Sequence, residues 1–304
     1  MANKYLKAKN CEEAIHFSQL HSDFSYISGG TDLMVNKYQK NNTSKTLIDL
    51  SDISEMKKLQ LNEDIVIIGS AITLSELEKN NELISLFPSL NKAIKSIASP
   101  LIRNSATIGG NLLCDNRCMY YNQSEWWREA IGNCLKCDGD ICIASGGKRN
   151  CFAKMVSDIA PVLISLKSSI CIAKEDKDII IPLEEIYSGD GINPHTFSKE
   201  SIVKEIIIPK GNPKTSFEKL RERKTLEFTS LSCSISVTGN NIRVVLGGVD
   251  SKPVVLDFEK SVPVEDIIIK STKKCRIIKN DLYSREYRKQ MIGVFIRNGL
   301  KNII

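Results

Sequence analysis

The chain has 304 residues, and its 42 Lys and Arg against 36 Asp and Glu give a formal net charge of +6. Spread over this length, the charge excludes the dense basic surface of a nucleic-acid-binding protein. Hydrophobic residues make up 42% of the chain and charged residues 26%, which excludes an intrinsically disordered protein. The length is sufficient for two or three domains with buried cores.

Apolar segments are short throughout the sequence. The longest runs, 65–68 and 206–208, have the length of a strand, whereas a membrane span needs roughly 20 apolar residues. The start of the chain lacks the apolar core of a signal peptide. We therefore expect a cytoplasmic protein that binds no membrane and no nucleic acid.

The first half of the chain predicts short strands and helices separated by glycine turns. Thr73 followed by Glu76 is a capping-box pattern, and the helical spacing of apolar residues after Pro88 predicts a helix that Pro100 ends. We expect helices at 11–21, 73–79 and 90–97, strands at 24–27, 47–50 and 64–68, and a helix or extended segment from residue 32.

The second half of the chain predicts a helix, then several strands, then a final helix. Pro161 near the start of an apolar segment indicates a helix with proline in its first turn. The pair Gly239-Asn240 between two apolar runs is typical of a tight hairpin. We expect helices at 158–166 and 284–300, strands at 170–173, 179–181, 202–208, 232–238, 241–247 and 252–256, and a domain boundary at 209–213.

Two Gly-Gly pairs, Gly29-Gly30 and Gly109-Gly110, lie 80 residues apart in the sequence. Glycine lets consecutive backbone N–H groups approach a ligand closely, and two such nests could hold a pyrophosphate from both sides. A Gly-Gly pair is also an ordinary turn, and neither pair fits the G-x-G-x-x-G pattern of dinucleotide-binding domains. On these residues alone, a phosphate site and a plain turn both remain open.

Cysteine is concentrated in one segment of the chain. Disulfides are rare in a reducing cytoplasm, so metal or redox chemistry explains a cysteine cluster there better. The other four of the ten cysteines are scattered and suit buried apolar positions. The six clustered ones occupy 38 residues and are Cys114, Cys118, Cys134, Cys137, Cys142 and Cys151.

The spacing of these cysteines leaves the metal open. Cys134 and Cys137 form a C-x-x-C, which is typical of zinc, but no second C-x-x-C follows. The three histidines, His16, His21 and His195, lie far away in the sequence. Four ligands chosen from six cysteines suit zinc and an iron–sulfur cluster equally well.

Longer segments around the glycine pairs, 28–33 (SGGTDL) and 103–112 (RNSATIGGNL), together resemble the two flavin-binding signatures of the FAD subunit of molybdenum hydroxylases. This is the family of xanthine dehydrogenase and carbon monoxide dehydrogenase. Residues 157–161 resemble its third motif, and 217–223 and 246–253 resemble its C-terminal domain. The resemblance covers nearly the whole chain, and the motifs occur in the family's order.

The resemblance implies an α+β fold: a two-lobed FAD-binding domain of the vanillyl-alcohol-oxidase type plus a C-terminal α+β domain. The FAD domain is expected at 1–210, with lobes at about 1–56 and 57–210, and the C-terminal domain at 214–304. The pyrophosphate would lie between the lobes on both glycine turns. Asp158 would lie near the ribityl–phosphate part of FAD, and Lys219 near the flavin. The implied FAD-binding residues are Ser28, Gly29, Gly30, Thr31, Asp32, Leu33, Thr107, Ile108, Gly109, Gly110, Asn111, Asp158 and Lys219.

Most members of this family lack a long cysteine-rich insertion after the second motif. The beta subunit of 4-hydroxybenzoyl-CoA reductase has such an insertion, with a [4Fe-4S] cluster, and residues 117–121, 125–131 and 138–142 resemble it closely. The insertion is expected at about 114–152. The resemblance implies that the ligands are Cys118, Cys134, Cys142 and Cys151, and that Cys114 and Cys137 are not ligands.

The resemblance further implies an oxidoreductase subunit without catalytic residues of its own. It would relay electrons between a ferredoxin-like carrier and two partners, a [2Fe-2S] small subunit and a molybdopterin large subunit. Electrons could instead run outward from a purine, aldehyde or heterocycle hydroxylase. A zinc-stabilised binding protein is another alternative, whereas a stand-alone flavin oxidase is disfavoured because neither glycine turn contains a histidine to tether FAD. A solvated face or a ferredoxin-docking patch would explain the basic residues Lys270, Lys273, Lys274, Arg276 and Lys279.

Overall fold

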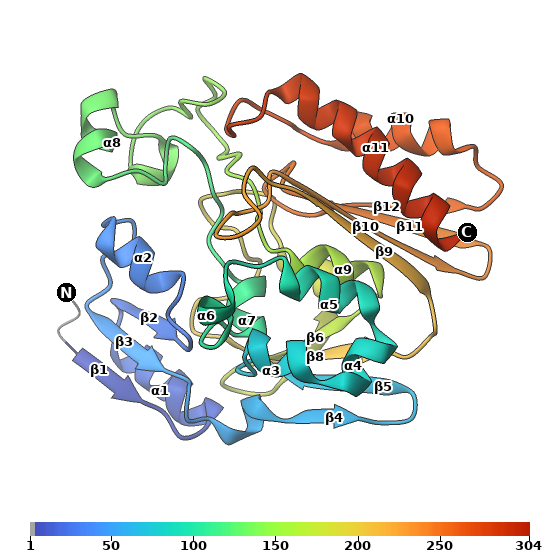
Figure 1. Ribbon diagram of the computed structural model, residues 1–304. Coiled ribbons are helices and arrows are strands. Elements are labelled where there is room, and N and C mark those ends of the chain that lie inside the picture. The colour runs from blue at the N-terminus through green and yellow to red at the C-terminus, as the bar shows by residue number, and fades with distance from the viewer. Residues whose placement is uncertain (1–3) are drawn as a thin grey trace.

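The computed structural model describes residues 4–304, so residues 1–3 of the predicted first lobe lie outside it. The first sheet of the described chain is parallel, with strand order β1-β3-β2 (Figure 1). Its elements are β1 (Lys4–Lys7), α1 (Cys11–Leu20), β2 (Phe24–Ile27), α2 (Leu33–Tyr38) and β3 (Thr46–Asp49). Asn10 caps α1 by accepting from the Glu13 amide.

The second sheet is antiparallel, with strand order β4-β5-β8-β6-β7. Its strands are β4 (Leu59–Leu61), β5 (Ile65–Gly69), β6 (Ser169–Ala173), β7 (Ile179–Pro182) and β8 (Ile202–Pro209). Short helices cover this sheet. Their apolar residues, such as Leu90, Ile108 and Val162, form one hydrophobic core with the strands. These helices are α3 (Leu74–Lys79), α4 (Asn81–Leu86), α5 (Pro88–Lys95), α6 (Pro100–Arg103), α7 (Ile108–Leu112) and α9 (Ile159–Ser165).

The third sheet is an antiparallel meander of order β12-β11-β10-β9. It consists of β9 (Lys214–Leu220), β10 (Leu231–Thr238), β11 (Asn241–Gly247) and β12 (Val254–Glu259), followed by α10 (Val264–Lys274) and α11 (Arg285–Ile303). Helix α11 packs on β9 and β10, and α9 contacts β10 and β11, so this sheet has helical neighbours from two parts of the chain. We propose that the three sheets mark the two predicted lobes and the predicted C-terminal domain.

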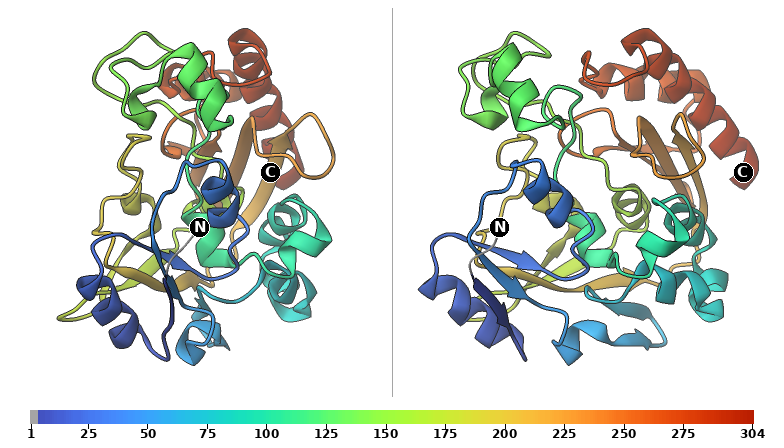
Figure 2. Two further views of the ribbon diagram at one scale, coloured as in Figure 1. Left: turned by 90° about the vertical axis from the view of Figure 1, so that its left-hand side faces the viewer. Right: turned by 60° about the vertical axis from the view of Figure 1, so that its left-hand side comes forward.

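The cysteine-rich segment leaves the second lobe and returns to it at one place. Arg117 and Lys154 form an antiparallel bridge with reciprocal backbone hydrogen bonds of 2.9 and 2.8 Å. Between them lie helix α8 (Glu125–Ile131) and a short 3-10 turn, Leu135–Cys137. In Figures 1 and 2 this segment stands at the top of the molecule, above α2. Arg128 joins the two by donating to the Gln39 carbonyl at 3.0 Å.

The structure corrects one sequence prediction and adds elements that were not predicted. Pro100 does not end the helix before it; α5 has already ended at Lys95, and Pro100 begins α6. Proline suits that first helical position because an N–H there has no intrahelical acceptor, so its absence costs no hydrogen bond. The capping box of Thr73 and Glu76 is confirmed. The helices and strands that the pattern did not predict are β1, β4, α4, α6, α7, α8, β9 and α10.

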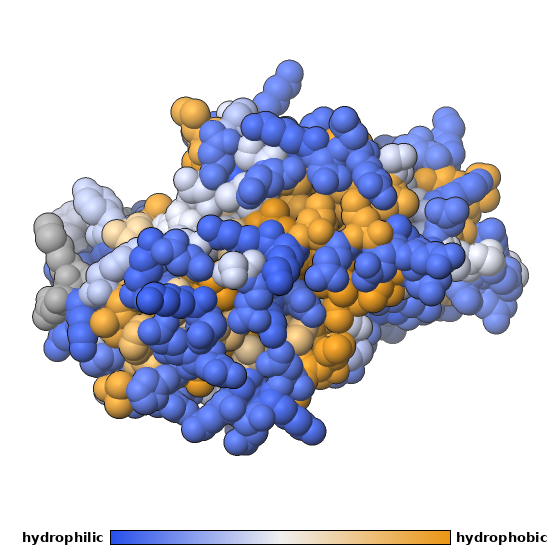
Figure 3. Space-filling model, turned by 90° about the horizontal axis from the view of Figure 1, so that it is seen from below, coloured by the Kyte–Doolittle hydropathy of each residue, from blue (hydrophilic) through white to orange (hydrophobic). Residues whose placement is uncertain are grey.

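Large apolar side chains are exposed at several places on the surface, among them Leu101, Ile180 and Ile269. The face seen from below in Figure 3 has an area of apolar side chains bordered by hydrophilic ones. Within residues 4–304, no helix combines the length and the apolar character that crossing a membrane requires. An exposed apolar area is typical of proteins that contact other proteins.

Candidate functional site

A cleft of about 1180 Å³ is lined by residues from the regions of all three sheets. All but two of the predicted FAD-binding residues line it. The exceptions are Ile108, which is fully buried in the core of the second lobe, and Lys219. The predicted residues that line the cleft are Ser28, Gly29, Gly30, Thr31, Asp32, Leu33, Thr107, Gly109, Gly110, Asn111 and Asp158.

The first glycine turn connects β2 to α2 and packs on the second motif. Gly30 has a φ of +68°, in the left-handed region that favours glycine. A Cβ on Gly29 would lie 1.9 Å from the Ser105 carbonyl oxygen, so only glycine fits there. The backbone N–H groups of residues 29–32 have no acceptor within residues 4–304. These residues line the cleft, and free backbone amides there suit an anion such as a phosphate.

The second glycine turn is the first turn of α7. Its amides already have acceptors: Gly109 donates to the Ser70 carbonyl at 2.8 Å, and Gly110 donates to the Thr107 hydroxyl at 3.1 Å. The two turns are therefore not the equivalent nests that the sequence suggested. Gly110 is exposed in the cleft, and a Cβ there would meet only the Thr107 hydroxyl, at 3.0 Å. The backbone of this turn can approach a ligand closely, but its Gly109 and Gly110 amides are not free to bind one.

The third motif is joined to the second by Asn111. The Asn111 side-chain oxygen accepts from the Ser157 hydroxyl at 2.8 Å, which holds the start of α9 against α7. Asp158 forms a buried ion pair with Lys219 of β9 at 2.6 Å, and its other carboxylate oxygen has no partner within residues 4–304. Burial raises the pKa of Asp158, and the Lys219 ammonium opposes that shift. Because Asp158 lines the cleft and Lys219 does not, Lys219 acts there through Asp158.

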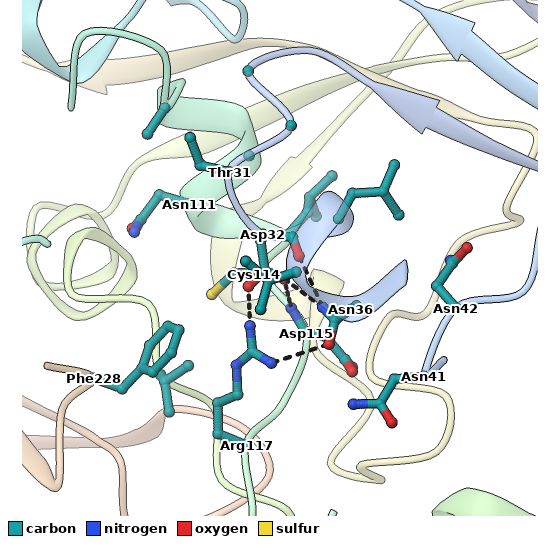
Figure 4. A pocket seen from close by; sticks show the side chains of 18 of the residues that line it. Thr31, Asp32, Asn36, Asn41, Asn42, Asn111, Cys114, Asp115, Arg117 and Phe228 are labelled. Carbon is teal, nitrogen blue, oxygen red and sulfur yellow. Dashed lines mark hydrogen bonds and ion pairs between the residues drawn. The ribbon is translucent and has the colours of Figure 1, made fainter. Parts of the chain in front are cut away.

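Sequence reasoning missed a polar network beside the first glycine turn. Arg117 forms an ion pair with Asp32 and donates to the Asn36 side chain at 3.1 Å, as Figure 4 shows. Its guanidinium lies 4.6 Å from the centre of the Phe228 ring, which extends from the third-sheet region. Arg117 directly precedes Cys118, so the network links the first glycine turn to the cysteine-rich segment.

The six clustered cysteines separate into two groups in space. Four of them line one small pocket: Cys118, Cys134, Cys142 and Cys151. Cys114 lines the large cleft instead, and Cys137 lines neither cavity. The other walls of the small pocket are largely apolar, and include Leu135, Ile143, Ala144, Phe152, Ala153 and Ile278.

Backbone turns hold the four cysteines in place. The Gly139 amide donates to the Cys134 carbonyl at 3.0 Å, and the Cys142 amide donates to the Gly147 carbonyl at 2.7 Å. The Ala153 amide donates to the Cys151 sulfur at 3.4 Å, a bond of the kind that stabilises a thiolate. The neighbouring Cys137 thiol lowers the pKa of the Cys134 thiol. Cys137 itself does not line the pocket.

Neither the four pocket cysteines nor the other candidate ligands of residues 4–304 surround a single point. Within the described range, 4–304, no group of three or more His, Cys, Asp or Glu side chains is arranged to hold a metal ion. His195 lines the large cleft and stacks on Phe197 at 5.4 Å between ring centres. Burial lowers the pKa of His195 to about 4, so it is neutral at physiological pH.

The sequence of residues 1–211 matches the family described as the FAD binding domain in molybdopterin dehydrogenase. The chain belongs to this family. The family resemblance drawn from the glycine-turn motifs is thereby confirmed: the chain is an FAD-binding subunit of the molybdenum hydroxylase type and an oxidoreductase component.

Individual relatives and structures agree with this assignment. The chain is 28% identical over 261 residues to the aldehyde oxidoreductase FAD-binding subunit PaoB of Escherichia coli, a match that covers 82% of each chain. It is 21% identical to the glyceraldehyde dehydrogenase medium chain of Sulfolobus acidocaldarius, over 98% of this chain and 97% of that one. The structure of CO dehydrogenase from Oligotropha carboxidovorans superposes with a TM-score of 0.76 at 17% identity, covering 100% of this chain and 98% of that chain. The predicted fold class is thereby confirmed.

Proposed function

We propose that this chain carries FAD and a [4Fe-4S] cluster as the electron-transfer subunit of a molybdenum enzyme similar to 4-hydroxybenzoyl-CoA reductase. The proposal rests mainly on one observation: the four cysteines that the resemblance implies as ligands line a common pocket, and Cys114 and Cys137 do not line it. Bound FAD would exchange electrons in pairs or singly, and the cluster would exchange them singly. The cleft and the cysteine pocket are the two sites of this chain that would hold these groups.

The donors and walls of the cysteine pocket suit a cluster. A cubane takes one thiolate per iron, and the pocket offers four thiols. Apolar walls and an N–H donor to the Cys151 sulfur are features that tune iron–sulfur sites. A single zinc ion needs its four ligands about 2.3 Å from one point. The cubane spreads its thiolates over four irons, which agrees better with cysteines that share a pocket without surrounding a single point.

The partners proposed for this subunit are a [2Fe-2S] small subunit and a molybdopterin large subunit. A relative of nearly the same length is named a medium chain, and another is named an FAD-binding subunit, which supports a multi-subunit complex. The substrate pocket would belong to the large subunit, because the residues that line the cleft of this chain are those expected to bind FAD. In the reductase direction, electrons would pass inward to an aromatic acyl-CoA.

Cofactor analysis of the complete chain tests this proposal. Anaerobically purified protein, co-expressed with its neighbouring genes, should contain one FAD and about four irons and four sulfides per chain. It should be yellow-brown and should co-purify with the two partner subunits. FAD without iron would identify an ordinary FAD subunit of a hydroxylase, and a colourless zinc protein would support the zinc-stabilised alternative.

The basic segment near the cysteine pocket supports an acidic electron carrier such as ferredoxin. Arg276 lies 4.9 Å from the centre of the Phe152 ring, and both Phe152 and Ile278 line the pocket. Lys273, Lys274 and Lys279 are exposed on the same segment, and within residues 4–304 they form no ion pair. An acidic protein attracted to these lysines would dock close to the cysteines.

Charge reversal of this segment tests the docking. Changing Lys273, Lys274 and Lys279 together to glutamate should lower the second-order rate of reduction by acidic ferredoxin at low salt by roughly tenfold or more. Reduction by dithionite should be unchanged, because a small reductant needs no docking patch. A matched control reverses three exposed lysines elsewhere, Lys57, Lys58 and Lys79. Equal losses in both triple variants would reflect net charge alone and would contradict docking at this segment.

A further inference from the structure

Three side chains form the wall between the FAD cleft and the cysteine pocket: Cys118, Tyr121 and Lys136 each line both cavities. Of these three residues, only Lys136 has a basic side chain. Its side chain is 6% exposed and forms an ion pair with Asp115 at 2.5 Å. It also donates to the Gly191 carbonyl at 2.6 Å and lies 4.8 Å from the centre of the Tyr121 ring.

The two charges of the Lys136–Asp115 ion pair lie differently with respect to the two cavities. Lys136 reaches the cysteine pocket, whereas Asp115 lines only the FAD cleft. The Asp115 backbone N–H donates to Asp32 of the first glycine turn at 3.2 Å, which attaches the negative end to that turn. Of the two residues, only Lys136 lines the cysteine pocket, so the positive end of the pair is the one next to the cysteines.

The position of Lys136 in the chain fixes this arrangement. It lies in the 3-10 turn Leu135–Cys137, two residues after Cys134. Three acceptors hold its ammonium: the Asp115 carboxylate and the carbonyls of Asn116 and Gly191. Because little water reaches it, its field is screened less than that of a surface lysine. The positive charge of Lys136 therefore acts electrostatically on a group bound in the cysteine pocket.

We infer that Lys136 is a positioning residue that raises the reduction potential of the group bound by the four cysteines, relative to the same site without its charge. This inference rests on the proposed function. One-electron reduction adds one negative charge at the cysteines, and the nearby ammonium stabilises that charge. The negative charge of Asp115 opposes this effect, so Lys136 raises the reduction potential and Asp115 lowers it.

Redox titration of the holoprotein, followed by the EPR signal of the reduced cluster, tests the inference. At a fixed potential, Lys136→Gln should lower the ratio of reduced to oxidised cluster roughly tenfold, which equals about 59 mV for a one-electron couple. Asp115→Asn should shift the midpoint upward, because it removes the opposing charge. Lys136→Arg keeps the charge and should stay close to wild type. Lys148→Gln, which removes an exposed charge from the same insertion, is the matched control and should not shift the midpoint.

The outcomes separate this inference from the proposed function. A wild-type protein without iron overturns both. A normal iron content with unshifted midpoints in Lys136→Gln and Asp115→Asn overturns the role of Lys136 and leaves the cluster in place. If Lys136→Gln does not retain iron, Asp115→Asn decides alone, and a midpoint that is unshifted or lowered in that variant overturns the inference.

Discussion

Replacing Gly110 with valine should leave the protein folded and remove its FAD. A Cβ at this position meets only the Thr107 hydroxyl, so a valine side chain stands in the cleft instead of the core. It would fill the space that a pyrophosphate needs next to the second glycine turn. A pyrophosphate displaced in this way would lose hydrogen bonds to the free amides of the first glycine turn. Losing two such bonds to a charged group, at about 1.5–3 kcal/mol each, weakens binding more than roughly 100-fold.

Flavin absorbance of the purified protein, together with a thermal unfolding curve, measures this effect. Gly211→Val is the matched control: Gly211 lies in an open loop with nothing near its Cβ position, so the variant should keep both flavin and stability. Gly29→Val should fail to fold, because its Cβ would lie 1.9 Å from the Ser105 carbonyl oxygen. A Gly110→Val protein with a full complement of FAD would show that the second turn does not approach the cofactor.

The strands and helices of the core followed from local patterns in the sequence. Phe24–Ile27, Leu231–Thr238 and Asn241–Gly247 are apolar runs bounded by turns, and each forms a strand as predicted. The missed elements lack such a pattern. β1 has one half-buried residue among exposed ones, and β9 has only two buried apolar residues, Phe217 and Leu220, three positions apart among polar ones. Their strand conformation comes from pairing with β3 and β10, which a single segment does not reveal.

The glycine turns were predictable because each is a continuous motif with a backbone requirement. The difference between them was not, since it depends on acceptors elsewhere in the chain, such as the Ser70 carbonyl. Arg117 and Lys136 were missed for the same reason. Each is an ordinary basic residue in sequence and gains its role from a carboxylate brought close by folding, Asp32 for Arg117 and Asp115 for Lys136.

Changing any one of Cys118, Cys134, Cys142 and Cys151 to alanine should reduce iron and sulfide from about four of each per chain toward zero. A cubane takes one thiolate per iron, and the pocket is lined by these four thiols. The measurement is iron and acid-labile sulfide analysis of anaerobically purified protein. FAD content should change less, because the glycine turns lie outside the insertion.

The comparison of Cys134 with Cys137 is the sharpest part of this prediction. The two residues flank one short turn, but only Cys134 lines the pocket. Cys137→Ala and Cys114→Ala should both retain the iron. If Cys137→Ala instead empties the site and Cys142→Ala does not, the C-x-x-C pair binds the metal and zinc becomes the better assignment.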